Sequence, residues 1–168
     1  MDLTSLFQWL QDSAVGTAIR EGDSLFPWIE TIHVLAITFV VGSIAAVDLR
    51  LLGWASKSRA FSKVNGEIVP LTWIAFAIAL ISGGLLFSSK AAKYADNLPF
   101  QIKVSSLLLL GINMAVFQWV TYRSIDHWDR ADVPPFAARV AGALSLILWV
   151  FVVTAGRTIG FTMNDLVE

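Results

Sequence analysis

Residues 28–53 read WIETIHVLAITFVVGSIAAVDLRLLG, a stretch whose ionisable groups lie only near its two ends. Glu30 and His33 come near its start, and Asp48 and Arg50 near its end. A helix that crosses the bilayer core of about 30 Å needs roughly 20 mostly apolar residues. Because a helix also pairs its own backbone N–H and C=O groups, this stretch predicts a membrane-spanning helix.

Three further segments of the chain have the same character. We expect four membrane-spanning helices, over 26–52, 68–89, 100–122 and 136–161. Of the 168 residues, 56% are apolar and 15% are charged, whereas soluble domains carry about 25% charge. Four such helices in a soluble protein would leave almost no polar surface. The sequence therefore predicts an all-α, up-down-up-down four-helix bundle that forms a single domain, 1–168, in a lipid bilayer.

The segment 2–20 has a different pattern from the four apolar segments. Its apolar residues recur at helical spacing, opposite polar ones: Leu3, Leu6, Phe7, Leu10, Ala14 and Ala18. This pattern predicts an amphipathic helix that lies in the membrane interface. The segment has no basic leader, so it does not read as a secretory signal.

Composition excludes several classes of function. The chain has no cysteine, which excludes disulfides, iron–sulfur clusters and thiolate metal sites. Its net charge of −1 gives no basis for binding nucleic acid through phosphates. No nucleophile–base pattern, phosphate-binding loop or metalloprotease motif is present. The sequence therefore names no catalytic residue and leaves open whether the protein is an enzyme.

The distribution of basic residues predicts an orientation. Seven of the twelve Lys and Arg residues lie in the first and third loops or at the helix ends beside them: Arg50, Lys57, Arg59, Lys63, Arg123, Arg130 and Arg139. Loops rich in Lys and Arg tend to stay in the cytoplasm. We therefore expect both termini on the outer, periplasmic side.

Four ionisable residues are expected at one level of the bundle, near the outer face. Up-down connectivity places Glu30 and His33 of the first helix level with Lys103 of the third and Arg157 of the fourth. Ionisable groups inside a membrane cost about 2.5 kcal/mol or more each, so they persist when they are paired or face the interior. We expect a polar pocket here. In the structural alternative, Lys103 and Arg157 extend to the headgroups and His33 only hydrogen-bonds a neighbouring helix.

Other polar residues have simpler expected roles. Asn113, deeper in the third helix, is expected to hydrogen-bond a neighbouring helix or to contact the ligand of the pocket. Asp48 and Arg50 lie at the cytoplasmic end of the first helix, where pairing with Arg139 or with a lipid phosphate is expected. His127 lies in the third loop and is expected to be solvated.

The stretches 28–53, 97–117 (NLPFQIKVSSLLLLGINMAVF) and 145–161 (SLILWVFVVTAGRTIGF) resemble an uncharacterised domain family of small bacterial inner-membrane proteins. The resemblance implies four helices and recurrent positions at Glu30, His33, Asp48, Arg50, Lys103, Asn113 and Arg157. More distantly, the chain is similar to copper-resistance D-type proteins and to small membrane-bound protoporphyrinogen oxidases. The oxidases place a histidine in the first helix and a lysine at the head of a later one, and they bind haem b.

Several hypotheses of function follow. In the first, His33 is an axial ligand of haem b or hydrogen-bonds a quinone, Lys103 and Arg157 hold propionates or ring oxygens, and Glu30 orients the imidazole. In the second, Glu30 and His33 bind a metal ion such as copper for transport or sensing, although the nearby cations oppose this. In the third, the chain is an assembly subunit of a homo-oligomer or larger membrane complex. Binding of a lipid or anionic solute is a further alternative.

Overall fold

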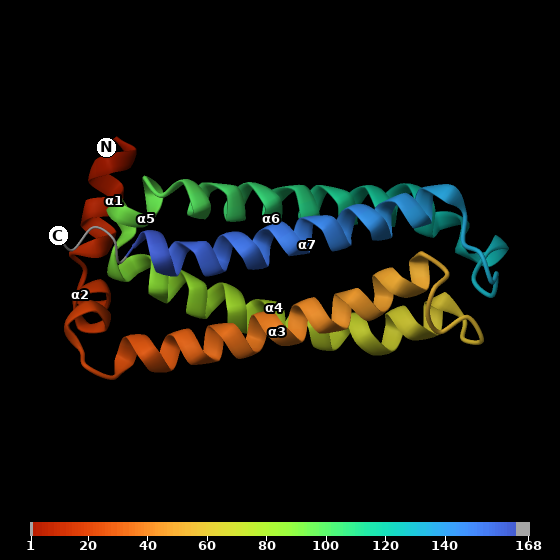
Figure 1. Ribbon diagram of the computed structural model, residues 1–168, viewed down its shortest axis with the longest axis horizontal. Coiled ribbons are helices and arrows are strands. Elements are labelled where there is room, and N and C mark those ends of the chain that lie inside the picture. Colours follow the sequence, from red (N-terminus) through yellow and green to blue (C-terminus); the bar gives the residue numbers. More distant parts are fainter. Residues whose placement is uncertain (1, 164–168) are drawn as a thin grey trace.

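The computed structural model describes residues 2–163, and these residues form helices and turns without a strand (Figure 1). The α-helices are α1 (Leu3–Gln11), α2 (Ala14–Glu21), α3 (Leu25–Leu51), α4 (Phe61–Ser89), α5 (Ala91–Ala95), α6 (Leu98–Val116) and α7 (Phe136–Thr162). A π-helical turn, η1 (Phe117–Thr121), and a 3₁₀ turn, η2 (Tyr122–His127), continue α6. The helices α3, α4, α6 with its continuation, and α7 are long and apolar enough to cross a membrane. The predicted all-α membrane bundle is confirmed, and the chain is a multi-pass membrane protein.

The bundle consists of two antiparallel hairpins, α3–α4 and α6–α7 (Figure 1). The hairpins contact each other mainly through α3 and α7, whereas α4 and α6 are not extensively packed together. Val40, Ala75, Leu110 and Val152, one from each long helix, meet in the central core. Many large apolar side chains outside this core are exposed, as expected for a surface that faces lipid rather than water.

Helix α4 begins at Phe61, before the start at residue 68 expected from hydropathy. Its first turn is capped from the third loop: the Asp129 carboxylate accepts hydrogen bonds from the Ser62 backbone N–H (2.7 Å) and the Ser62 hydroxyl (2.8 Å). The backbone N–H of Phe61 donates to the Asp129 carbonyl. A carboxylate at a helix start satisfies N–H groups that the helix itself leaves unpaired. The cap lies far away in sequence, so hydropathy does not reveal it.

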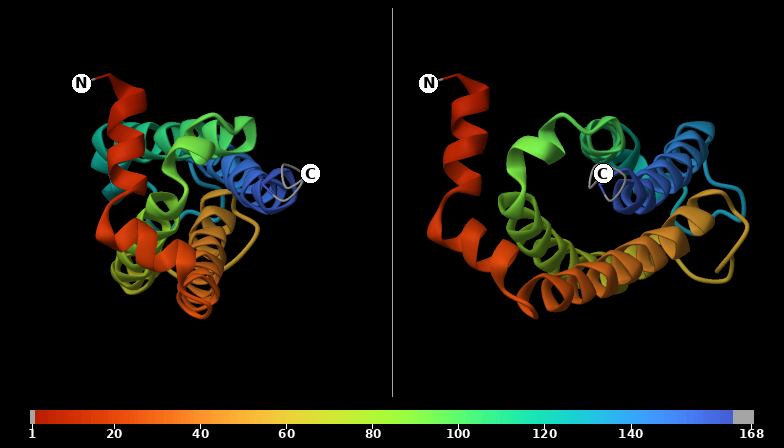
Figure 2. Two further views of the ribbon diagram at one scale, coloured as in Figure 1. Left: turned by 90° about the vertical axis from the view of Figure 1, so that its left-hand side faces the viewer. Right: turned by 60° about the vertical axis from the view of Figure 1, so that its left-hand side comes forward.

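The N-terminal segment forms two helices, not the single helix expected over 2–20. The chain turns at Ser13, whose hydroxyl accepts the backbone N–H of Gly16 (3.1 Å) and so caps α2. Both helices lie across the end of the bundle (Figures 1 and 2). Arg20 fixes them there, because its guanidinium donates to the carbonyl of Gln11 (3.1 Å) and to that of Ser89 at the end of α4 (3.2 Å).

At the opposite end, a fully buried arginine connects the first and third loops. Arg50 donates from Nε to the carbonyl of Arg59 (3.1 Å) and from Nη2 to those of Asp129 (3.3 Å) and Ala131 (3.2 Å). Because Arg50 is fully buried, the expected pairing with a lipid phosphate is wrong for this arginine. Loop carbonyls, which hydropathy and charge counting do not consider, are its partners instead.

Candidate functional site

His33 is held between α3 and α4 with one ring nitrogen occupied. Its Nδ1 lies 2.9 Å from the carbonyl oxygen of Ala79 and 3.1 Å from the Ser82 hydroxyl oxygen. The Ser82 hydroxyl donates to the Ile78 carbonyl (2.6 Å). Since the Ala79 carbonyl can only accept, Nδ1 carries the proton and donates it. In the neutral imidazole, Nε2 then has a free lone pair. Nε2 forms no hydrogen bond with the described residues and is not fully buried, so a ligand can reach it.

The ring of His33 lies directly on Gly83 of α4. A Cβ atom at Gly83 would be 2.9 Å from Cε1 and 3.3 Å from Nδ1 of the imidazole. These distances are shorter than a van der Waals contact allows, so only glycine leaves room for the ring in this position. The support that Gly83 gives to the ring is apparent only in the structure.

Lys103 enters the same half of the bundle from the other hairpin. Its side chain is half-buried and runs along α7, where Nζ is 3.8 Å from the position of a Cβ at Gly156. Its ammonium has no hydrogen-bond or ion-pair partner among residues 2–163. His33 near the start of α3 and Lys103 near the start of α6 therefore lie in the same half of the bundle, on different hairpins.

Glu30 and Arg157 do not turn into the bundle with them, which corrects the expectation of four converging groups. Both residues are exposed. The Arg157 guanidinium lies over the ring of Phe161, 5.0 Å from its centre, on its own helix α7. Burial, and to a smaller extent the negative charge of Glu30, raises the pKa of Tyr94 in the short helix α5. Residues three apart on a helix share a face only approximately, so Glu30 is exposed although His33 is half-buried.

Together His33 and Lys103 offer one hydrogen-bond acceptor and one charged donor. Nε2 of His33 can accept a proton or hydrogen bond, or can coordinate a metal. The ammonium of Lys103 can donate to an oxygen or pair with an anion. A molecule with a hydroxyl or carbonyl oxygen at each of two ends matches this pair.

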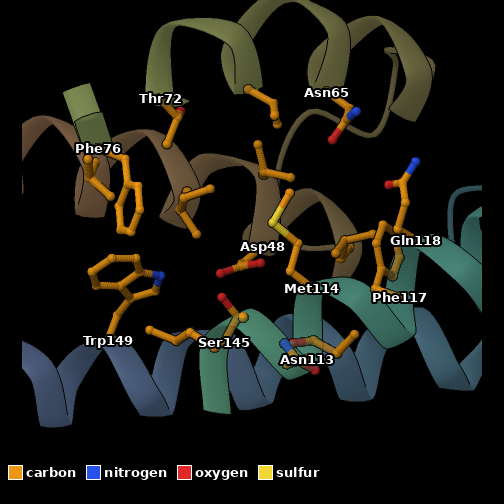
Figure 3. Close-up of a pocket in the computed structure, with 18 of the residues that line it drawn as sticks. Asp48, Asn65, Thr72, Phe76, Asn113, Met114, Phe117, Gln118, Ser145 and Trp149 are labelled. Atoms are coloured by element: carbon orange, nitrogen blue, oxygen red, sulfur yellow. Dashed lines mark hydrogen bonds between the residues drawn. The ribbon is translucent and has the colours of Figure 1, made fainter. Parts of the chain in front are cut away.

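Asn113 lies in a different part of the bundle from His33. It follows Lys103 by ten residues, about 15 Å along a helix. Its side-chain N–H donates to the carbonyl of Ala141 on α7 (3.0 Å), which is the expected interhelical hydrogen bond. Asn113 also lines a cavity of about 210 Å³ in the half of the bundle nearest the first and third loops (Figure 3).

Asp48 lies in the wall of that cavity and is 4% exposed. Its Oδ2 is buried without a hydrogen-bond partner among the described residues, and the ion pairs found between residues 2–163 do not include it. The expected pairing of Asp48 with Arg139 is therefore not observed. From the sequence we expected Asp48 at the membrane interface; the available signal for burial was an acid inside a predicted membrane-spanning segment.

The second histidine of the chain is distant from the first. His127 lies in η2, at the far end of the bundle from His33. Among residues 2–163, no three His, Asp or Glu side chains are grouped so that they could hold a metal ion.

Comparison with known sequences matches residues 6–162 to a family of unknown function, DUF6644. The match covers most of the chain and agrees with the resemblance to an uncharacterised family. No curated protein and no solved structure matches the chain. The distant similarities to copper-resistance D-type proteins and protoporphyrinogen oxidases remain predictions from sequence.

Proposed function

We propose that this chain, which belongs to the DUF6644 family of unknown function, binds a redox cofactor of the quinone type between His33 and Lys103. The observation that carries the proposal is the hydrogen bond from Nδ1 of His33 to the Ala79 carbonyl (2.9 Å). It fixes the tautomer in which Nε2 is an acceptor. A quinol hydroxyl can donate to Nε2, and the ammonium of Lys103 can donate to the oxygen at the other end of the ring.

The residues present fit haem b less well than a quinone. Nε2 of His33 could serve as one axial ligand, because ligating histidines usually donate their other ring N–H to a carbonyl or carboxylate. The second histidine, His127, lies at the opposite end of the bundle. Of the two cations expected to hold propionates, Arg157 is exposed and lies over Phe161. We therefore favour the quinone.

The other hypotheses have less support in the geometry. A copper or other metal site at His33 would need Glu30, which is exposed, and would lie in the same half of the bundle as the cation Lys103. A role as an assembly subunit of a homo-oligomer or larger complex remains a prediction from sequence. We also propose, from the distribution of Lys and Arg and from the family resemblance, that the protein lies in a bacterial inner membrane with both termini in the periplasm.

Titration of the purified protein with a short-chain ubiquinone tests the site. We expect His33→Gln and Lys103→Met each to weaken binding about tenfold, because a hydrogen bond to a charged or buried group is worth about 1.5 kcal/mol or more. Arg157→Gln is the matched control: it removes a cation at the same level that points outward, so affinity should not change. Wild-type affinity in both the His33 and Lys103 variants would refute the proposal.

A further inference from the structure

The cavity beside Asp48 is a second site, separate from His33 and Lys103. It is lined by residues of all four long helices and of η1 (Figure 3). Its walls are mainly apolar, with aromatic rings from Phe76, Trp149 and Phe117 around the carboxylate of Asp48. The volume of about 210 Å³ equals roughly seven water molecules at about 30 Å³ each. It is large enough for a compact organic molecule.

The carboxylate of Asp48 points into this cavity (Figure 3) and forms no ion pair with another of residues 2–163. The hydroxyl of Ser145 on α7 faces it, while Oδ2 has no hydrogen-bond partner in the described part of the chain. Arg50, two residues further along α3, directs Nε and Nη2 to the loop carbonyls, and its Nη1 is buried without a hydrogen-bond partner among the described residues. A buried carboxylate without a partner is costly, so a ligand that supplies one is favoured.

The cavity opens between α4 and α6. Trp73 of α4 and Met114 of α6 line it, yet they are 51% and 42% exposed, so they stand at its mouth. These two helices are not extensively packed against each other. Asn65 and Gln118 line the end of the cavity nearest the first and third loops (Figure 3). Their amide groups offer hydrogen bonds to a ligand that passes from the membrane interface to Asp48.

We propose that this cavity binds a small organic cation whose ammonium group pairs with Asp48. The alkyl part of the cation lies against the rings of Phe76 and Trp149. The faces of these rings also attract the positive charge itself. A hard metal cation such as Ca²⁺ would require six to eight oxygen ligands, whereas this cavity offers one carboxylate and scattered amides and hydroxyls. An ammonium group needs only the carboxylate and a few such acceptors.

The absence of native cysteine allows a direct test in the full-length protein. Met114→Cys places one thiol in the cavity wall, and its reaction rates with a cationic reagent (2-aminoethyl methanethiosulfonate) and a neutral reagent of similar size (methyl methanethiosulfonate) are compared. The ratio of the two rates cancels changes in the reactivity of the thiol itself. Ser58→Cys, in the exposed first loop, gives the ratio in the absence of the cavity.

We expect the cationic-to-neutral ratio to be about tenfold or more higher at Met114→Cys than at Ser58→Cys, because a nearby unscreened carboxylate attracts the cation. Adding Asp48→Asn should remove this excess while leaving the rate with the neutral reagent unchanged, which shows that the fold is intact. n-Butylammonium should protect the thiol, and n-butanol should not. A ratio that Asp48→Asn leaves unchanged, or equal protection by n-butylammonium and n-butanol, would overturn the proposal.

Discussion

The position of the His33 ring depends on a single residue of the neighbouring helix, Gly83. We predict that Gly83→Ala pushes the ring off the Ala79 carbonyl, because the new methyl group would lie 2.9 Å from Cε1. Affinity for a short-chain ubiquinone should fall about tenfold, the cost of one such hydrogen bond. Gly84→Ala is the control, since a Cβ there meets nothing within 4 Å. Equal affinities in the two variants would show that the ring does not matter for binding.

Arg50 should contribute more to stability than any exposed arginine. We predict that Arg50→Lys lowers the free energy of unfolding by about 3 kcal/mol, because a lysine cannot reproduce the planar fork that donates to three loop carbonyls. Arg59→Lys should cost less than about 1 kcal/mol, since the Arg59–Glu67 ion pair is on the surface. Denaturant titration of the detergent-purified variants would measure both, and similar losses would contradict this role for Arg50.

The sequence predicted the depth of single residues better than their partners. His33 and Lys103 were expected to face inward at one level because helical rise fixes depth along each helix. The direction of Glu30 and Arg157 and the burial of Asp48 depend on how each helix is rotated about its axis. That rotation is set by contacts between distant residues, such as the close approach of Gly142 to α3.

Among the elements, α3 and α7 make the contact that joins the two hairpins. A Cβ at Gly142 of α7 would lie 3.0 Å from the carbonyl oxygen of Asp48 and 3.0 Å from Cβ of Leu51. We predict that Gly142→Ala forces the helices apart and costs about 1–3 kcal/mol of stability, the usual range for overpacking. Gly160→Ala, in the same helix with nothing within 4 Å, should have no such effect. Thermal unfolding in detergent compares the two variants.

Helix existence was predictable from the apolar segments, but helix ends and breaks were not. The start of α4 at Phe61 depends on Asp129 of the third loop, a tertiary cap. The break between α1 and α2 depends on Ser13, which caps α2. The apolar residues continue at helical spacing on both sides of Ser13, so the sequence pattern predicted one helix. Hydropathy indicates how many residues of a helix lie in lipid. The ends of the helix are set by capping hydrogen bonds, which hydropathy does not detect.

On the scale of the whole molecule, the predicted orientation places the first and third loops in the cytoplasm. We predict that a membrane-impermeant thiol reagent added to intact cells labels Asp23→Cys, in the exposed turn before α3, but not Ser58→Cys. Both cysteines should react after the cells are opened. The reverse pattern in intact cells would invert the topology and move the His33 level to the cytoplasmic side.

The two polar regions lie in opposite halves of the bundle, where the hairpins meet without close packing of α4 against α6. The quinone should bind between His33 and Lys103, and the organic cation should bind in the cavity beside Asp48. We expect the two sites to bind independently of each other. The most direct measurement is the quinone content of the wild-type protein and of His33→Ala, both purified with native lipid, together with their absorbance spectra. We expect quinone to be extracted from the wild type and to be lost in His33→Ala. Quinone at the level of lipid alone in both preparations would contradict it.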